Sequence, residues 1–429
     1  MLSISAISRI LRATLGDGLV LARIEDGWLF VLNPSAAALW DLHANGLDTE
    51  SISTLLTQRF GLAEDIARTQ VNNLVSGWRG AGLIDAAEVP PAASGNTVEA
   101  NSHSFRYHRN PDAMEGEDQK RPCNMDTGDP CQYKSLMQPY AAQPAPKLAG
   151  ALRLEVSGTV VGLYCDDAAL RSSIAALVQP LRPDAANPVD HWLHLVGTAS
   201  TWHLWLDGTV SVDGAGADAA IVAVVSALVE LGCRSADRLL VIHGAGLVLS
   251  DGRGLLLIAP GGSGKTTLSA ALNADGYGLL GDDVVPVNHD GTLAGLGTPI
   301  CLKAGSWPIL SSRRPDIGTT RVVQRFGQPV RYLSPHGLKP VKPCPLGLML
   351  FPRYRPGSSP CIEPLTPEAA LQGIVEAESV IRNLDQTKLE NLVCWVNSAP
   401  AYVMTYPNLD SGLALIRQLV SELHYLRQS

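Results

Sequence analysis

The residues with the clearest chemistry lie in segment 259–267, which reads Ala-Pro-Gly-Gly-Ser-Gly-Lys-Thr-Thr. An apolar run at 255–258 precedes it and a helix-like stretch at 268–273 follows it. The sequence therefore predicts a strand, a glycine-rich turn and a helix that begins at Lys265. In such a turn, backbone N–H groups and the positive end of the helix dipole bind phosphate oxygens. This pattern predicts a nucleotide-binding site, although Ala259 stands where the usual motif begins with glycine.

Residues within this turn have separate predicted roles. Lys265 places a positive charge on the β- and γ-phosphates, and the Thr266 hydroxyl is a candidate Mg²⁺ ligand. ATP and Mg²⁺ are therefore the expected cofactors. The residues predicted to bind the nucleotide are Gly261, Gly262, Ser263, Gly264, Lys265, Thr266 and Thr267.

Two adjacent carboxylates follow the next predicted strand, where the run 277–280 ends in Gly281, Asp282 and Asp283. Beside a phosphate-binding turn, such a pair suits phosphoryl transfer. One carboxylate holds Mg²⁺ and the other accepts the proton of the attacking hydroxyl. We assign Asp283 to Mg²⁺ and Asp282 to the base, and the alternative is an Asp-Asp surface turn.

Three further polar residues lie within apolar segments. His243 lies on the strand predicted before the glycine-rich turn, where a histidine is either part of the core or part of the site. Lys303 and Arg353 are isolated basic residues, and each suits either a phosphate contact or a side chain that extends to solvent.

Residues 1–86 are predicted to form one small α+β module. Two strands, 19–24 and 28–32, are joined by Asp26-Gly27, a strong hairpin signal, and a weaker strand is expected near 4–10. Three helices follow, starting at Asn33-Pro34, at 48–50 and at 63–65. Strands followed by three short helices indicate a winged-helix-like module.

The remainder of the chain divides into a linker and a larger domain. Residues 87–147 are rich in Pro, Ser, Asn, Gly and charge, which predicts a flexible linker. Its Cys123 and Cys131 suit either a disulfide or half of a metal site, or are incidental. Residues 148–429 are predicted to form an α/β domain around the glycine-rich turn.

Composition limits the partners. The 429 residues include 33 basic and 41 acidic side chains, a net charge of −8, so we expect no binding to nucleic acid or to an anionic membrane through the chain as a whole. We find no signal peptide and no apolar run long enough to span a bilayer, so we expect a cytoplasmic protein. A homo-oligomer is compatible with the sequence.

Taken in order, His243-Gly244, the turn at 261–266 and Gly281-Asp282-Asp283 resemble the catalytic core of HPr kinase/phosphorylase and its smaller relatives. The resemblance implies a fold akin to phosphoenolpyruvate carboxykinase, with His243, Lys265, Asp282 and Asp283 in the active site. This chain has Thr266-Thr267 where that family has Ser-Glu, which argues against HPr itself as the substrate.

The N-terminal module resembles the peptide chaperone of pyrroloquinoline quinone biosynthesis, through 32–40, Leu55-Leu56 and 80–84. In that family a leader peptide pairs with the exposed edge of the third strand and packs against the last helix. The resemblance implies that the helix is 64–79 here. The residues of the implied leader-binding edge are Trp28, Leu29, Phe30, Val31 and Leu32.

Together these features predict an ATP-dependent kinase that phosphorylates a Ser or Thr hydroxyl of a ribosomally made precursor peptide, held by its leader. Two alternatives are open. One is a kinase of a small metabolite or of a carrier protein. The other is a nucleotide-responsive DNA-binding regulator, which the low positive charge of helix 64–79 disfavours.

Overall fold

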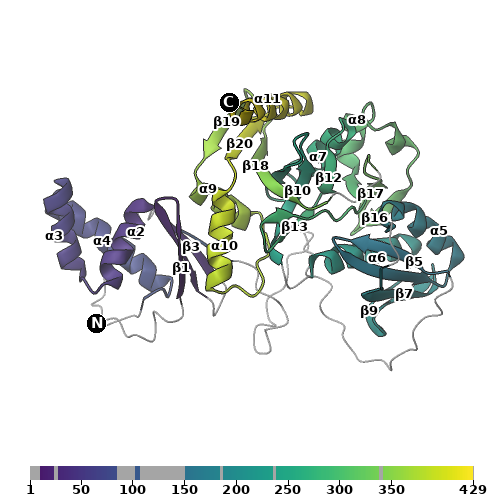
Figure 1. Cartoon of the computed structure of the whole chain (residues 1–429), viewed down its shortest axis with the longest axis horizontal. Coiled ribbons are helices and arrows are strands. Elements are labelled where there is room, and N and C mark those ends of the chain that lie inside the picture. The colour runs from purple at the N-terminus through teal and green to yellow at the C-terminus, as the bar shows by residue number, and fades with distance from the viewer. Residues whose placement is uncertain are drawn as a thin grey trace. The chain divides into compact units, whose positions relative to one another are not determined.

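The computed structural model describes residues 10–23, 28–84, 102–106, 150–183, 187–234, 238–337 and 342–428. The elements form a mixed α/β protein with a small α+β region at the N-terminus (Figure 1). The chain divides into two compact units. Unit 1 comprises Met1–Ala113 with Pro364–Tyr402, and unit 2 comprises Met114–Glu363 with Val403–Ser429.

Unit 1 contains a four-stranded antiparallel sheet in the order β1-β2-β3-β4. Its strands are β1 (Ile10–Leu15), β2 (Gly18–Arg23), β3 (Trp28–Leu32) and β4 (Ser102–Arg106). The pairing of β2 with β3 confirms the predicted hairpin. The weaker strand expected near residues 4–10 lies almost wholly outside the described residues, within which β1 is the first strand. Strand β4 lies within the range predicted as a linker.

Three helices follow the first three strands and lie on one side of them (Figure 1). They are α2 (Pro34–Ala44), α3 (Thr49–Phe60) and α4 (Glu64–Gly80). Their starts agree with the sequence prediction, and the first two have side-chain caps, whereas Ala63 before α4 makes no such bond. The side chain of Asn33 accepts a hydrogen bond from the Ala36 N–H at 2.8 Å, and that of Asp48 accepts one from the Ser51 N–H at 2.8 Å.

The core of this region lies between the helices and the sheet. Trp40 of α2 packs edge to face against Trp78 of α4, with ring centroids 5.2 Å apart. Trp40 is therefore a core residue.

Two helices from far along the chain complete unit 1: α9 (Pro367–Glu376) and α10 (Gln386–Asn397). Helix α10 packs along β1, as Figure 1 shows, and α9 contacts β3 and β4. The Gln386 amide donates to the Arg12 carbonyl oxygen at 2.7 Å and accepts from the Arg12 N–H at 3.3 Å. This side chain therefore pairs with backbone groups of β1 much as a neighbouring strand would.

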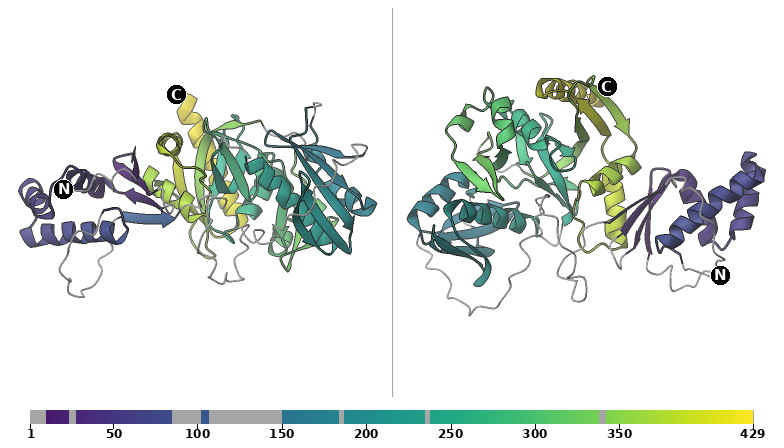
Figure 2. Two further views of the ribbon diagram at one scale, coloured as in Figure 1. Left: turned by 90° about the horizontal axis from the view of Figure 1, so that it is seen from below. Right: turned by 180° about the vertical axis from the view of Figure 1, so that it is seen from behind.

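Unit 2 contains a five-stranded sheet in the order β5-β6-β7-β8-β9, with α6 packed across it and α5 against β6 (Figure 2). The elements are β5 (Leu152–Val156), β6 (Thr159–Cys165), α5 (Ala168–Leu177), a 3₁₀ turn (Gln179–Leu181), β7 (His191–Thr198), β8 (Thr201–Leu206), β9 (Thr209–Gly214) and α6 (Ala217–Cys233).

A second, eight-stranded sheet carries the predicted chemistry. Its order is β11-β10-β13-β14-β18-β20-β19, with β12 paired to β10 and with β11 also paired to β18 in parallel. Its strands are β10 (Arg238–Val248), β11 (Gly254–Ile258), β12 (Gly278–Gly281), β13 (Val284–Asn288), β14 (Thr292–Leu293), β18 (Cys344–Tyr354), β19 (Cys361–Leu365) and β20 (Ala401–Tyr406). Helices α7 (Lys265–Ala274) and α11 (Leu409–Gln428) pack against each other, and α7 also packs on β10.

A third sheet, in the order β15-β17-β16, lies next to α7 through β15. Its elements are β15 (Ile300–Lys303), β16 (Val322–Arg325) and β17 (Gln328–Leu333), with α8 (Trp307–Leu310) and 3₁₀ turns at Ala304–Ser306 and Pro315–Gly318 between them.

Candidate functional site

The glycine-rich loop joins β11 to α7. Every residue of β11 is buried, and α7 begins at Lys265 directly after Gly264. Gly264 has a φ of 87°, a left-handed conformation that costs glycine little and strains other residues. The predicted order of strand, turn and helix is therefore confirmed, including the helix start at Lys265.

Lys265 is held against this loop and is only 6% exposed. Its Nζ donates hydrogen bonds to the carbonyl oxygens of Ala259 and Pro260, the latter at 3.0 Å. Burial lowers the pKa of Lys265, and although the charge of Asp283 opposes this shift, the charge of Lys303 adds to it. Two neutral carbonyl groups thus hold a buried ammonium group, and a phosphate would add the negative charge that such a cation favours.

Ser263, Thr266 and Thr267 place three hydroxyl groups along the same segment, and two of them differ in their partners. The Thr267 Oγ1 lies 2.6 Å from the Ser306 Oγ, so this hydroxyl is used within the protein. The Ser263 Oγ is buried and has no hydrogen-bond partner among the described residues. A buried hydroxyl without a partner is costly unless a ligand satisfies it, so Ser263 fits a phosphate-binding role.

Asp282 and Asp283 follow β12 at a sharp turn. A Cβ on Gly281 would lie 2.3 Å from the Val284 carbonyl oxygen, so only glycine fits at the start of this turn. Asp282 is 6% exposed, and its Oδ2 accepts a hydrogen bond of 2.9 Å from the Cys301 N–H. Burial and then the neighbouring charge of Asp283 raise the pKa of Asp282 to about 7.

Asp283 has different surroundings, and its side chain is 52% exposed. Its Oδ1 lies 3.6 Å from His243 Nε2, and its Oδ2 lies 4.0 Å from an Arg325 guanidinium nitrogen. Desolvation acts to raise the pKa of Asp283, but His243, then Arg325 and Lys265, outweigh it, so the pKa is lowered. Asp283 is therefore the ionised member of the pair.

The structure brings His243, Lys265, Asp282 and Asp283 together, as the sequence predicted. It also adds Arg325, at the end of β16, which the sequence analysis did not select. An Arg325 N–H donates to the Cys301 Sγ at 3.4 Å, so Arg325 approaches Asp283 from the third sheet. No local motif surrounds this arginine, and only the folded position of β16 identifies it.

The two remaining basic candidates differ. Lys303, at the end of β15, is exposed and acts electrostatically on Lys265. Arg353 is exposed near the end of β18. Because Leu257 pairs with Leu350 in the parallel register of β11 and β18, Arg353 lies at the edge of the sheet where the loop begins. Their roles as phosphate contacts stay predictions.

A Mg²⁺ ion of a nucleotide complex needs few protein ligands, because phosphate oxygens and water complete its shell. The residues present fit that requirement. The Thr266 hydroxyl has no hydrogen-bond partner among the described residues, and Asp283 offers an exposed, ionised carboxylate. Within the described part of the chain no cluster of three or more His, Cys, Asp or Glu residues could hold a metal ion by itself.

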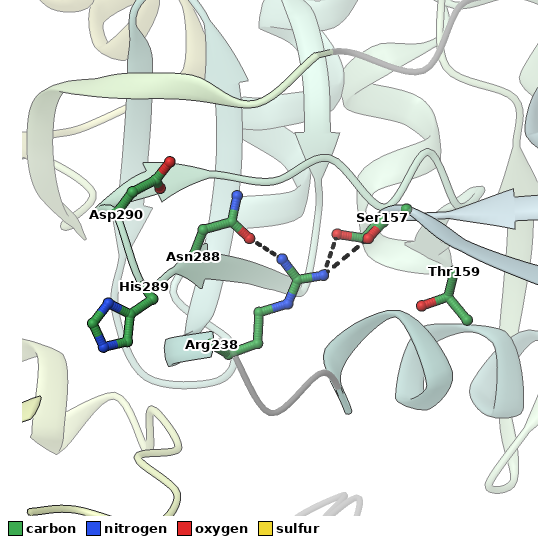
Figure 3. Close-up of a pocket in the computed structure, with 7 residues that line it drawn as sticks. Ser157, Thr159, Arg238, Asn288, His289 and Asp290 are labelled. Atoms are coloured by element: carbon green, nitrogen blue, oxygen red, sulfur yellow. Dashed lines mark hydrogen bonds between the residues drawn. The ribbon is translucent and has the colours of Figure 1, made fainter. Parts of the chain in front are cut away.

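A second polar site involves Arg238 and is structural (Figure 3). Its guanidinium donates to Ser157 Oγ at 2.7 Å, to the Ser157 and Gly232 carbonyl oxygens at 3.0 Å each, and to the Asn288 side chain. These bonds tie the β5–β6 turn to β10 and β13. Arg238 in this pocket therefore holds these elements together.

The edge predicted to bind a leader peptide is β3. Its residues Leu29, Phe30, Val31 and Leu32 are buried, and Trp28 is partly buried. Both backbone edges of β3 are paired, one with β2 and the other with β4, in a register that matches Val31 with Val20 and with His103. The edge that the sequence led us to expect as exposed is thus occupied by residues of the same chain, and its role in leader binding stays a prediction.

Residues 18–84 match the family model of coenzyme PQQ synthesis protein D (PqqD). The match begins at β2 and ends after α4, so the PqqD-like region covers most of the N-terminal α+β region and leaves out β1, β4, α9 and α10. No curated protein matches the chain. The match supports the resemblance to the pyrroloquinoline quinone peptide chaperone, while the resemblance of 235–310 to HPr kinase stays an expectation.

Two further sequence-based expectations concern the linker and membrane-spanning helices. Cys123 and Cys131 lie outside the described residues, as does most of the predicted linker 87–147. No helix in the described part of the chain is long and apolar enough to cross a membrane.

Proposed function

We propose that this protein is an ATP-dependent kinase that phosphorylates a Ser or Thr hydroxyl of a ribosomally synthesised precursor peptide, whose leader the PqqD-like region holds. The observation that carries the catalytic half is the convergence of the glycine-rich loop, through Lys265, with Asp282, Asp283, His243 and Arg325. The PqqD match supports the peptide half.

The chemistry follows from the different surroundings of the two aspartates. Asp282, with a pKa of about 7, suits a general base that takes the proton of the acceptor hydroxyl. The hydroxyl oxygen forms a bond to the γ-phosphorus, the bond from that phosphorus to the bridging oxygen breaks, and ADP leaves with that electron pair.

Positive charge surrounds the place where negative charge develops during transfer. The charges of Lys265 and Arg325 both act on Asp283, and Asp283 with Thr266 would hold the Mg²⁺ ion of the nucleotide, which would offset phosphate charge. His243 contacts Asp283 and orients its carboxylate.

The PqqD-like region is a better peptide-binding module than a DNA-binding one. Arg68 of α4 pairs with Glu64 at 2.8 Å, which leaves little positive charge on this helix for phosphate contacts. A leader held by this region raises the local concentration of the acceptor hydroxyl without sequence recognition at the catalytic site.

Mass spectrometry of phosphate transfer tests the proposal. The full chain is incubated with Mg²⁺, γ-labelled ATP and peptides encoded by short reading frames beside its gene. We expect the label on a Ser or Thr of one peptide, and a loss of about 10²-fold or more for Lys265→Ala and Asp282→Asn. Arg153→Ala, which removes an exposed charge on β5, is the matched control. Label on a small metabolite or a folded carrier protein instead would support the alternative kinase.

A further inference from the structure

Two tyrosines near the glycine-rich loop form a ring pair with no assigned role. Tyr354 is the last residue of β18, and Tyr406 is the last residue of β20. Their ring centroids are 5.8 Å apart with an interplanar angle of 54°. Tyr406 is 3% exposed, whereas Tyr354 is 53% exposed, so the buried ring of Tyr406 packs against the exposed ring of Tyr354.

Tyr406 connects this pair to the loop. Its hydroxyl lies 3.1 Å from the position that a Cβ on Gly264 would take, and its ring lies 2.9 Å from the corresponding position on Gly412 of α11. The Arg355 N–H also donates to the Tyr406 carbonyl oxygen at 3.0 Å. These close contacts fix Tyr406 against the residue that precedes Lys265, and they fix the place of Tyr354 relative to the loop.

The direction of the strands places Tyr354 on the ligand side of the sheet. Strand β18 runs parallel to β11, with Leu257 opposite Leu350, so both strands end at the same edge. In α/β sheets, ligands bind outside the carboxyl ends of parallel strands. Tyr354 therefore lies at the same edge of the sheet as the start of the loop that would hold phosphates.

We propose that Tyr354 stacks on the nucleobase of the nucleoside triphosphate, with Tyr406 as its support. This assignment rests on the proposed function, because it assumes that the loop holds the phosphates. An aromatic face attracts any base through its π system, and stacking of one base on one aromatic ring is a substantial part of nucleotide affinity. Tyr354 would then give the site a higher affinity for nucleotides than for polyphosphates that have no base.

Titration calorimetry of the full chain with two Mg²⁺-complexed probes tests this role. One probe is a non-hydrolysable ATP analogue with an imido β–γ bridge, and the other is inorganic tripolyphosphate, which has no base. We expect Tyr354→Ala to weaken binding of the analogue by about 5- to 100-fold and to leave tripolyphosphate binding unchanged. Tyr354→Phe keeps the aromatic face and should keep the affinity for the analogue.

Tyr425→Ala, which removes another exposed tyrosine on α11, is the matched control and should change neither affinity. Unchanged binding of the analogue by Tyr354→Ala would overturn the proposal. Equal loss of both probes would also overturn it, since the residue would then act through the loop. A wild-type chain that binds neither probe would instead refute the nucleotide site of the proposed function.

Discussion

At the scale of single residues, Asp282 and Asp283 are neighbours in sequence with opposite electrostatic surroundings. Asp282 is buried and accepts a hydrogen bond from the Cys301 N–H, whereas Asp283 is half-exposed and lies near His243 and Arg325. The pKa of the first is raised and that of the second is lowered. Two carboxylates with separated pKa values suit a division of labour between proton transfer and charge stabilisation.

This separation predicts a pH-dependent stability. The ordinary pKa of an aspartate carboxyl is 3.8, and burial raises that of Asp282 to about 7 in the fold, so between these values the folded state binds more protons than the unfolded state. Stability is therefore lost as pH rises through this window. Asp282→Asn keeps an acceptor for the Cys301 N–H and removes the charge, so we expect it to stabilise the protein at pH 8 by about 1–4 kcal/mol and to have little effect near pH 4.

Urea unfolding at the two pH values measures this difference. Asp213→Asn, on the exposed side of β9, is the control and should behave like the wild type at both. An equal effect of Asp282→Asn at pH 4 and pH 8 would show that its carboxyl is not destabilised by burial. A variant that gains stability while it loses activity would mark Asp282 as a residue retained for chemistry.

For Asp283, the expected change is in the metal dependence. Asp283→Asn removes the charge that interacts with His243, Arg325 and Lys265, so under the proposed function the nucleotide complex would lose one anionic ligand for Mg²⁺. We expect a fall in phosphotransfer of about 10²-fold at low Mg²⁺, with partial recovery as Mg²⁺ is raised. Initial rates over a Mg²⁺ series measure it, and a uniform loss at every Mg²⁺ concentration would contradict a role as ligand.

At the scale of elements, strand β4 determines what the PqqD-like sheet exposes. A leader that pairs with β3 must take the place of Ser102–Arg106. Replacing these residues by a Gly-Ser sequence of equal length should speed hydrogen exchange of the β3 amides that face β4 by about tenfold or more, and should leave the amides of β2 unchanged. The same replacement at residues 92–96 is the control. Unchanged exchange in β3 would mean that β4 does not protect this edge.

The elements also differ in how far their sequence predicts them. The starts of helices α2 and α3 are predicted by their N-cap residues Asn33 and Asp48, because a cap is a local interaction that needs no distant partner. Strand β4 carries no alternating apolar pattern and is defined by its pairing with β3. Arg325 likewise lies in the site because β16 pairs with β17, and no pattern around it encodes that position.

At the scale of the whole molecule, unit 1 is built from two distant parts of the chain. Helix α10 packs on β1, and Gln386 bridges the backbone of Arg12. The sequence predicted a recognition domain of residues 1–86 and a separate domain of 148–429. It offered no signal for this packing, because the amphipathic pattern of α9 and α10 does not say which surface they cover.

Removal of residues 1–86 tests the organisation. We expect a higher KM for a full-length precursor, because the leader loses its site, and also a fall in Tm of about 5 °C or more, because α9 and α10 lose their partners. Thermal unfolding measures the second effect. The full chain with Gln386→Ala is the comparison. Loss of the exposed hydrogen bonds between Gln386 and the Arg12 backbone should lower the free energy of unfolding by only about 0.5–1.5 kcal/mol. A truncated chain as heat-stable as the intact one would show that α9 and α10 do not depend on β1 and β3.

The two-part construction of unit 1 has a consequence for engineering and for gene fusion. A recognition region that ended at residue 86 could be exchanged for another by one crossover, which would redirect the catalyst to a new peptide. Here the helices that cover β1, β3 and β4 are encoded between β19 and β20. A chimera therefore needs three matched junctions, one after the N-terminal segment and one on each side of the α9–α10 segment, and a swap of the N-terminal segment alone should yield poorly folded hybrids.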